Sequence, residues 1–207
     1  MKNIGIIGSG SFGCALATVL IKNHNVKIRL GHSHNNSYEK SMKGILLHIL
    51  SRSSKKYANI KNKNVLVAFF MAAGKKCDGY VNKIEIGRAD GKDISNEFIK
   101  SIFKETKIKV TIENKMNDYL KTHACAVLPL VFASYKVDGN LKLLKKDKEY
   151  SLLIMDAIIE GYDVLKKLGY EILPKGEYEN CVNKKEKCAF IYRFMFSNFI
   201  GKMCISD

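Results

Sequence analysis

The 207-residue sequence predicts an α/β domain followed by a mainly α-helical domain. Three observations predict this class. Short apolar runs typical of buried strands alternate with helical segments in the first part of the chain. A glycine-rich turn joins the first strand to the first helix. From about residue 117 the pattern is helical almost to the end. We therefore assign residues 1–114 to the first domain and residues 115–207 to the second.

The first strand, Asn3 to Ile7, leads into glycines spaced G-x-G-x-x-G and then into an apolar stretch rich in Ala and Leu. In this order the segment is typical of a dinucleotide-binding turn in a Rossmann-type domain. Gly8 permits the tight turn, Gly10 lets a pyrophosphate approach the backbone, and Gly13 lets the helix pack close to the strand. The N–H groups and the dipole at the start of the helix attract phosphate. The predicted cofactor-binding turn comprises Gly8, Ser9, Gly10, Ser11, Phe12 and Gly13. The alternative is an ordinary strand–loop–helix turn.

The second strand, Asn25 to Leu30, indicates which nicotinamide cofactor the turn would bind. An NAD site uses an acidic residue about 20 residues beyond the glycines to hold the ribose 2′-hydroxyl. No acidic residue stands between Lys27 and Ser37. Arg29 and His32 stand there instead, and their donor groups suit a 2′-phosphate. The sequence therefore predicts NADPH; the alternative is that Arg29 and His32 belong to a solvated loop.

Composition limits the partners. The formal net charge is +15, but 31 of the 35 basic residues are lysines spread along the chain. Sequence-specific reading of bases relies on arginine, so we expect no nucleic-acid partner, with a lysine-rich nucleic-acid binder as the alternative. No apolar run approaches the roughly 20 residues of a membrane span, so we expect no membrane partner.

The six cysteines include no C-x-x-C pair, and no set of histidines and cysteines has zinc spacing. The sequence therefore predicts no metal site, and reduced thiols in a cytoplasmic protein. The N-terminus is a strand with glycines rather than a signal peptide.

The remaining elements follow in order. Further strands are expected at 44–50, 64–70, 80–87 and 107–113, with a helix at 93–105. In the second domain, helices are expected at 117–136, 151–169 and 183–201; the first of them contains Pro129 and should be kinked there. We expect the sheet to be smaller than a full Rossmann sheet, with an exposed edge. Such an edge tends to pair with another chain, which allows a homodimer.

Several stretches carry a resemblance to a known family, in the family's order. They are IGIIGSGSFG, GILLHI, VAFFMAAGKKCDGYV followed by IEIGRADGK, MNDYLKTHACAVLPL and AIIEGYDVLKKLGYEILP. Through them the chain resembles the ketopantoate reductase (2-dehydropantoate 2-reductase) family, as a shortened outlying member. The resemblance implies an NADP-binding Rossmann domain joined to a helical domain like that of 6-phosphogluconate dehydrogenase. It also implies NADPH-dependent reduction of a 2-oxo acid similar to 2-dehydropantoate, and hence a small-molecule substrate and a place in pantothenate biosynthesis.

The resemblance also implies a catalytic residue, because Lys121 matches the family's lysine near the substrate carbonyl. An ammonium group there stabilises the charge that builds on the carbonyl oxygen and can deliver the proton. Without the resemblance, Lys121 would be one of many lysines on a helix surface. Cys125 and Pro129 stand where the family has asparagines. A central strand–helix–strand section and the C-terminal helices of the family are also missing. The alternative function is therefore a non-catalytic NADP-binding relative.

Other polar residues in these segments have simpler interpretations. His123 lies two positions after Lys121, so on a helix it faces away from it. Glu160 is expected on the polar face of its helix. Asp78 and Asp90 stand beside glycines, as is typical of turns.

Overall fold

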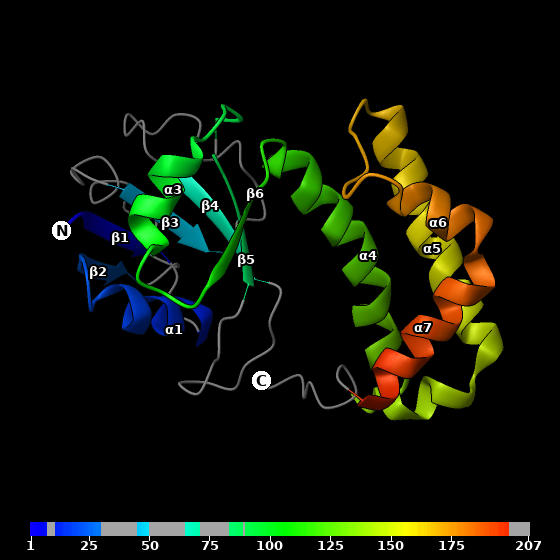
Figure 1. Cartoon of the computed structure of the whole chain (residues 1–207). Coiled ribbons are helices and arrows are strands. Elements are labelled where there is room, and N and C mark those ends of the chain that lie inside the picture. Colours follow the sequence, from blue (N-terminus) through cyan, green and yellow to red (C-terminus); the bar gives the residue numbers. More distant parts are fainter. Residues whose placement is uncertain (8–10, 30–44, 50–64, 71–82, 89, 199–207) are drawn as a thin grey trace. The chain divides into compact units, whose positions relative to one another are not determined.

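The computed structural model describes residues 1–7, 11–29, 45–49, 65–70, 83–88 and 90–198. The chain forms two compact units, Met1–Asn117 and Asp118–Asp207. The first is built around a sheet and the second from helices (Figure 1). This is a Rossmann-like domain followed by a helical domain.

The sheet of the first unit has six strands in the spatial order β2-β1-β3-β4-β5-β6. All neighbouring strands run parallel except β4 and β5, which are antiparallel. The strands are β1 Asn3–Ile7, β2 Asn25–Arg29, β3 Ile45–Ile49, β4 Val65–Phe70, β5 Lys83–Arg88 and β6 Lys109–Ile112. Each of the six strands expected from the sequence is therefore present.

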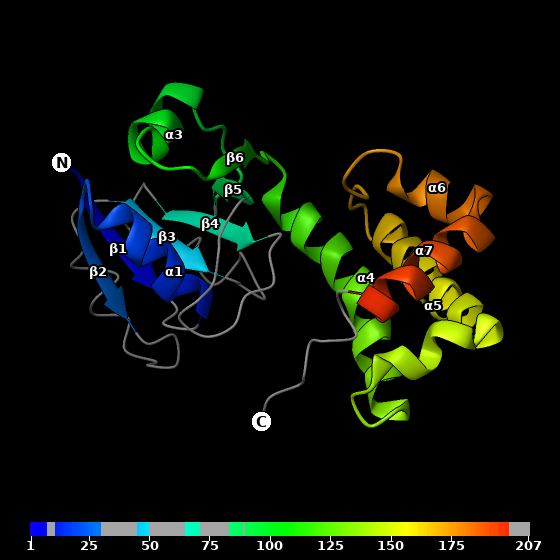
Figure 2. The ribbon, with the colours of Figure 1, turned by 60° about the horizontal axis from the view of Figure 1, so that its bottom comes forward.

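Two described helices, α1 (Ser11–Leu20) and α3 (Asn96–Phe103), share one hydrophobic core with β1, β4 and β5 (Figure 1, Figure 2). Strand side chains alternate between the two sides of a sheet, and the strand members of this core lie at every second position. They are Ile4, Ile6, Leu66, Ala68, Ile84 and Ile86. Residues at the alternate positions of these strands are buried as well, among them Ile7, Val67 and Phe69. The central strands are thus buried on both sides, which explains why they are nearly continuous apolar runs in the sequence.

The sheet was expected to be smaller than a full Rossmann sheet, although the sequence marked six strand segments. The standard doubly wound sheet has six strands, and this sheet has six. The number is kept because β5 and β6 extend the sheet beyond β4. Strands β2 and β6 form its two edges.

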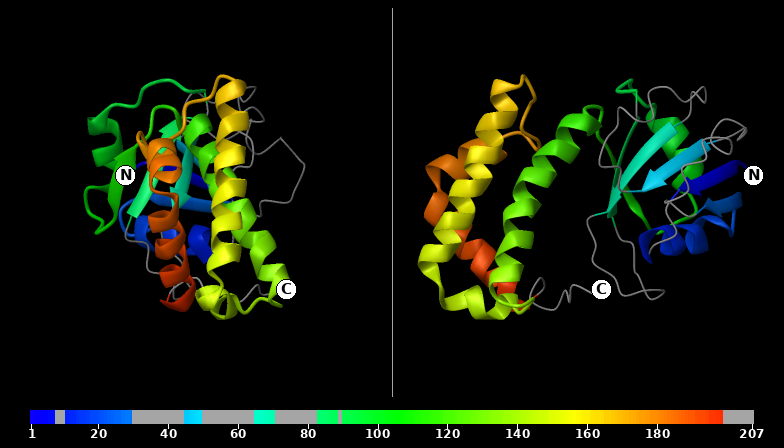
Figure 3. Two further views of the ribbon diagram at one scale, coloured as in Figure 1. Left: turned by 90° about the vertical axis from the view of Figure 1, so that its right-hand side faces the viewer. Right: turned by 180° about the vertical axis from the view of Figure 1, so that it is seen from behind.

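The helical unit is built from α4 to α7 and one short 3₁₀ helix, η2. Their bounds are α4 Met116–Lys136, η2 Leu141–Lys146, α5 Lys148–Lys167, α6 Glu177–Asn183 and α7 Lys185–Asn198. Helix α7 packs along α5 and against η2 (Figure 3). Their shared core includes Met155, Ile158, Tyr162, Cys181 and Phe196. Among the helices described, none is both long enough and apolar enough to span a membrane.

Helix ends differ from the expected ones for local reasons. Helix α5 begins three residues before the expected Ser151, because the Asp147 carboxylate accepts a hydrogen bond of 2.8 Å from Tyr150 N–H and caps the helix there. Its C-terminal end is closed by Gly169 at a φ of +82°, as expected of a glycine in this place. The last helix expected, 183–201, is α7, which begins at Lys185. Helix α6, just before it, was not expected as a separate element.

Candidate functional site: the switch point of the sheet and the start of α4

The sheet has a switch point between β1 and β3. The chain passes from β1 through α1 to β2 on one side of β1, and then returns to β3 on the other side. In open α/β sheets, ligands bind in the crevice that this reversal leaves at the carboxyl ends of the strands. The carboxyl end of β1 is Ile7, so the crevice lies where the glycine turn follows in sequence.

The predicted cofactor-binding turn connects β1 to α1. Gly8, Ser9 and Gly10 lie outside the described residues, and so do the side chains of Ser11 and Phe12. The backbone of Ser11, Phe12 and Gly13 forms the first turn of α1, and Gly13 is buried. Only three residues thus separate the carboxyl end of β1 from the start of a helix, as the dinucleotide-binding turn requires.

Arg29 is the last residue of β2 and lies beside Ile7 in the parallel register of β1 and β2. Its backbone is therefore at the same edge of the sheet as the glycine turn. The Arg29 side chain and the whole of His32 lie outside the described residues. Their role toward a 2′-phosphate remains a prediction.

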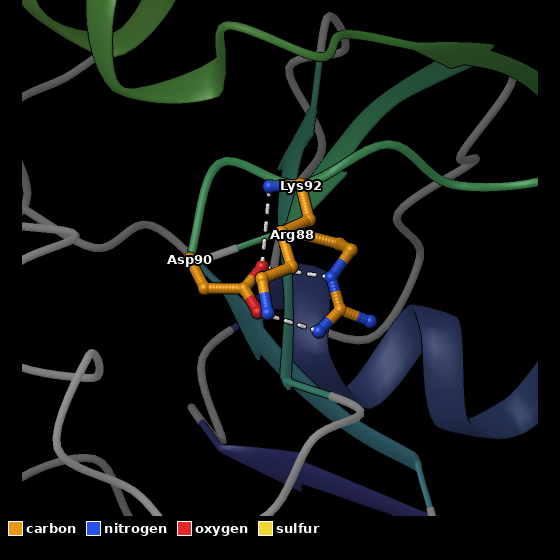
Figure 4. A network of polar contacts seen from close by, with 3 residues as sticks. All are labelled: Arg88, Asp90 and Lys92. Atoms are coloured by element: carbon orange, nitrogen blue, oxygen red, sulfur yellow. Dashed lines mark hydrogen bonds and ion pairs between the residues drawn. The ribbon is translucent and has the colours of Figure 1, made fainter.

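A polar network at the end of β5 lies away from this edge (Figure 4). The Arg88 guanidinium donates two hydrogen bonds, of 2.7 and 2.6 Å, to the two carboxylate oxygens of Asp90. Lys92 N–H donates to the same carboxylate at 3.3 Å. The bond from Arg88 is the main reason that the pKa of Asp90 falls to about 2. Because Arg88 lies beside Leu66 near the start of β4, the network lies at the amino ends of the parallel strands, and Asp90 is a turn residue as expected.

Lys121 lies in the second turn of α4 and is half-buried. Its Nζ atom is 4.5 Å from the centroid of the Tyr170 ring, a distance at which the ring face attracts an ammonium group. Tyr170 follows the C-terminal end of α5. The predicted catalytic lysine is therefore in contact with an aromatic ring rather than projecting freely from a helix surface.

The segment after α5 is fastened to the start of α4 by side chains on either side of Lys121. The Asp118 carboxylate accepts from Glu171 N–H at 3.0 Å, and the Thr122 hydroxyl oxygen accepts from Leu173 N–H at 3.2 Å. Thr122 is buried, and its hydroxyl donates to the Asp118 carbonyl at 2.9 Å. The bond to Leu173 satisfies a backbone N–H that would otherwise be buried without a partner, whereas the bond to Glu171 lies at the surface. We call the segment Gly169–Leu173, with its bonds to Asp118 and Thr122, the α4 clamp.

Cys125, one turn beyond Lys121, packs against α5. A Cβ atom added at Gly161 would lie 3.1 Å from both the Cβ and the Sγ of Cys125, so the two helices meet closely here. Burial raises the pKa of the Cys125 thiol. At the position of the family's first asparagine, the chain thus has a packed neutral thiol that cannot replace an amide.

Pro129 and His123 have packing roles as well. Pro129 lies inside α4, where it lines an apolar groove of about 350 Å³ with Leu128, Phe132 and residues of α5. His123 is half-buried, and burial lowers its pKa. Glu160 is exposed on α5, as expected. Asp78 lies outside the described residues.

In the part of the chain that the structure describes, no group of three or more His, Cys, Asp or Glu side chains could hold a metal ion. The glycine turn belongs to the sheet unit and Lys121 to the helical unit. The residues that sequence reasoning missed are Tyr170, Asp118 and Thr122. The spacing of Asp118 and Thr122 on one helix face was visible, but their partners are about 50 residues away in the sequence.

Known proteins match this chain in structure and not in sequence. No protein-family model and no curated protein matches the sequence. The dimeric ketopantoate reductase from Staphylococcus aureus superposes with a TM-score of 0.63 at 12% identity, over 99% of this chain and 82% of that chain. The 2-dehydropantoate 2-reductase from Geobacter metallireducens superposes with a TM-score of 0.65 at 10% identity, over 93% and 87%.

A related oxidoreductase has the same fold. D-Mandelate dehydrogenase, solved with NADH, superposes with a TM-score of 0.60 at 14% identity, over 99% of this chain and 87% of that chain. The likeness extends through both units in all three structures. The resemblance read from the sequence is therefore confirmed at the level of fold: this chain has the two-domain fold of the 2-dehydropantoate 2-reductases.

Proposed function

We propose that this protein is a nicotinamide-dependent reductase of small 2-oxo acids. The observation that carries the proposal is the switch point between β1 and β3, with a glycine-spaced turn leading into α1 at that edge of the sheet. The fold shared with ketopantoate reductases and D-mandelate dehydrogenase supports it. The residues present fit a dinucleotide, since a helix N-terminus begins at the carboxyl end of a central parallel strand.

The chain's own residues would act in two places. The first N–H groups of α1 and the glycine backbone would hold the pyrophosphate, and Arg29 and His32 would hold a 2′-phosphate. When bound, the nicotinamide supplies the hydride. The Lys121 ammonium would stabilise the negative charge that builds on the carbonyl oxygen of the substrate and then donate the proton to it. The product is the 2-hydroxy acid.

We further propose NADPH rather than NADH as the cofactor. The support is the absence of an acidic residue from Lys27 to Ser37 and the presence of Arg29 at the end of β2. The NADH bound to D-mandelate dehydrogenase shows that this fold also accommodates the other cofactor. We therefore attribute the choice between the two cofactors to the residues at the end of β2 and after it.

The first test is a paired titration of the protein with NADPH and NADH, followed by nicotinamide fluorescence. We expect saturable binding of NADPH at least tenfold tighter than NADH, a difference of about 1.4 kcal/mol. Turnover is then measured with 2-dehydropantoate and with the oxo acid that corresponds to mandelate. Absence of binding by either cofactor would overturn the proposed function.

A second candidate, a relative that binds NADPH without catalysis, is favoured by Cys125. The residue one turn after Lys121 is this cysteine, packed against Gly161, so no side-chain amide stands at that position. Lys121→Ala distinguishes the two candidates. A loss of about 100-fold or more in turnover supports catalysis, and the same residual turnover in wild type and Lys121→Ala supports the non-catalytic relative. NADPH affinity serves as the control, since it should be unchanged.

A homodimer is the assembly that we propose. The Staphylococcus aureus reductase of the same fold is described as dimeric. The helical unit exposes many large apolar side chains in the described residues, and such surfaces are typical of interfaces. They include Leu128, Phe132, Tyr135, Leu153, Leu168, Phe190 and Phe194. Light scattering at several concentrations would give twice the monomer mass; a monomer throughout would contradict this proposal.

A further inference from the structure

We propose that Tyr170 is a positioning residue for Lys121. Its ring face holds the Lys121 ammonium in one place beside the first turns of α4, so that the cation is preorganised before substrate binds. The proposal rests on the proposed function for the catalytic consequence, but its geometric part stands on the contacts within the helical unit alone.

The contact itself is well placed for this role. Lys121 Nζ lies 4.5 Å from the Tyr170 ring centroid, and both residues are half-buried. A lysine ammonium sits on a flexible four-carbon stem, so a lysine on an open helix surface samples many positions. An aromatic face attracts the cation without neutralising its charge.

The ring is held by backbone bonds rather than by its own side chain. Tyr170 N–H donates to the Leu165 carbonyl at 3.0 Å, in a turn closed by Gly169 at a φ of +82°. The next residues are fastened to α4 by the bonds from Glu171 to Asp118 and from Leu173 to Thr122. Asp118 and Thr122 lie three positions before and one after Lys121. The α4 clamp therefore fixes the ring relative to the turn of helix that carries the lysine.

Two other lysines lie over tyrosine rings in the helical unit. Lys136 is 3.6 Å from the centroid of Tyr150, and Lys166 is 3.6 Å from that of Tyr178. Both of these lysines are exposed. Tyr150 lies in the first turn of α5 and has no contact with the α4 clamp among the interactions above. The Tyr150 pair is therefore a matched control for the effect of removing a ring from a lysine.

The first arm of the test measures the geometry without any reaction. Lysines are methylated with ¹³C-formaldehyde, and the methyl resonance of Lys121 is identified by its absence from the Lys121→Arg variant. We expect this resonance to be shifted by the ring current of the tyrosine, to keep its shift in Tyr170→Phe, and to lose it in Tyr170→Leu. A wild-type resonance without a ring-current shift, unchanged in Tyr170→Leu, would overturn the proposal, whether or not the protein reduces an oxo acid.

The second arm measures the catalytic consequence on unmethylated protein. Tyr170→Leu should lower kcat about tenfold and leave KM for the oxo acid within about twofold, because misplacement of a catalytic group acts on the transition state. Tyr170→Phe should retain kcat near that of wild type, and Tyr150→Leu should leave it unchanged. Equal kcat in Tyr170→Leu and wild type would overturn the positioning role.

The two arms separate the possible failures. A wild-type protein without turnover overturns the proposed function, and the resonance of Lys121 still decides whether Tyr170 holds it. Circular dichroism and thermal unfolding of each variant show whether the helical unit is intact. Tyr170→Phe keeps the ring and its packing. If Tyr170→Leu alone has a fold defect, the ring-current shift of the Lys121 resonance can still be compared between Tyr170→Phe and wild type.

Discussion

The cofactor edge of the sheet and the α4 clamp are assembled in different ways. At the sheet edge, β1 and α1 follow one another within 20 residues, and the sequence between them has the glycine spacing of a dinucleotide-binding turn. In the clamp, Lys121 meets Tyr170, and Asp118 and Thr122 bond to backbone groups 53 and 51 residues away. One region is a local motif, and the other exists only when α4 and α5 are packed.

This difference predicts how each region responds to change. A substitution in the glycine turn should affect cofactor binding directly and leave the helical unit intact. A substitution in the clamp should change local stability and the position of Lys121 without touching the cofactor. The following experiments, from the largest expected effect to the smallest, test that separation.

Gly87→Ala should destabilise the sheet unit most. A Cβ atom at Gly87 would clash with the Met116 side chain and with the Glu113 backbone carbonyl. Relieving the second clash requires a displacement of the backbone, which costs more energy than moving the end of a flexible side chain. We expect a loss of about 3 kcal/mol in the free energy of unfolding, as for severe overpacking. Urea unfolding followed by circular dichroism measures it. Gly91→Ala is the control, because space is open there and only its φ of +72° opposes alanine, at a cost of about 1 kcal/mol. Equal losses in the two variants would contradict the packing of β5 against residues 113–116.

Thr122→Val should loosen the α4 clamp. Valine has the shape of threonine without the hydroxyl, so the buried N–H of Leu173 would lose its acceptor. We expect a loss of about 2 kcal/mol, with faster hydrogen exchange at the Leu173 amide. Thr122→Ser keeps the oxygen and should retain slow exchange there. Unchanged exchange in Thr122→Val would show that the bond does not hold the segment.

Arg29→Ala should weaken NADPH binding about tenfold, or about 1.4 kcal/mol, and leave NADH binding unchanged. The physical reason is that a guanidinium at the end of β2 would contact only the 2′-phosphate. The measurement is the paired fluorescence titration with each cofactor. An equal loss for both cofactors would mean that Arg29 supports the fold of this edge and does not choose the cofactor.

Asp90 should contribute the smallest effect, and only in acid. Its folded-state pKa is lowered to about 2, below the ordinary value, so its contribution is present above about pH 4 and is lost as the pH falls toward 2. Because the pair with Arg88 is partly exposed, we expect less than about 0.5 kcal/mol. Unfolding measured at pH 5 and pH 2.5 in wild type and Asp90→Asn gives the difference. A larger acid effect in Asp90→Asn than in wild type would reverse the assigned sign.

Local patterns predicted the elements better than the contacts between them. The strands and α3, α4 and α5 appear in the sequence because apolar periodicity and caps act over a few residues. The short helix α6 before the expected last helix was missed, since no glycine or proline separates it from α7 at Lys184. The six strands were predicted, but their order in the sheet was not, because pairing partners lie far apart in the sequence.

The candidate site shows the same limit. The glycine spacing and the missing acid after β2 were visible, since both lie within one βαβ unit. The partner of Lys121 was not, because Tyr170 follows another helix and its ring is placed by bonds from Asp118 and Thr122. Cys125 was recognised as a departure from the family, but only the structure gave its packing against Gly161.

The sequence by itself determined the order of strands and helices, the turn between β1 and α1 and the resemblance to ketopantoate reductases, because each of these depends on neighbouring residues. Only the tertiary structure decided the order of strands in the sheet, the switch point between β1 and β3, and the ring that contacts Lys121. The physical reason is that hydrogen bonds and packing between distant segments form when the chain is compact, and residues such as Thr122 and Gly161 meet their partners only then.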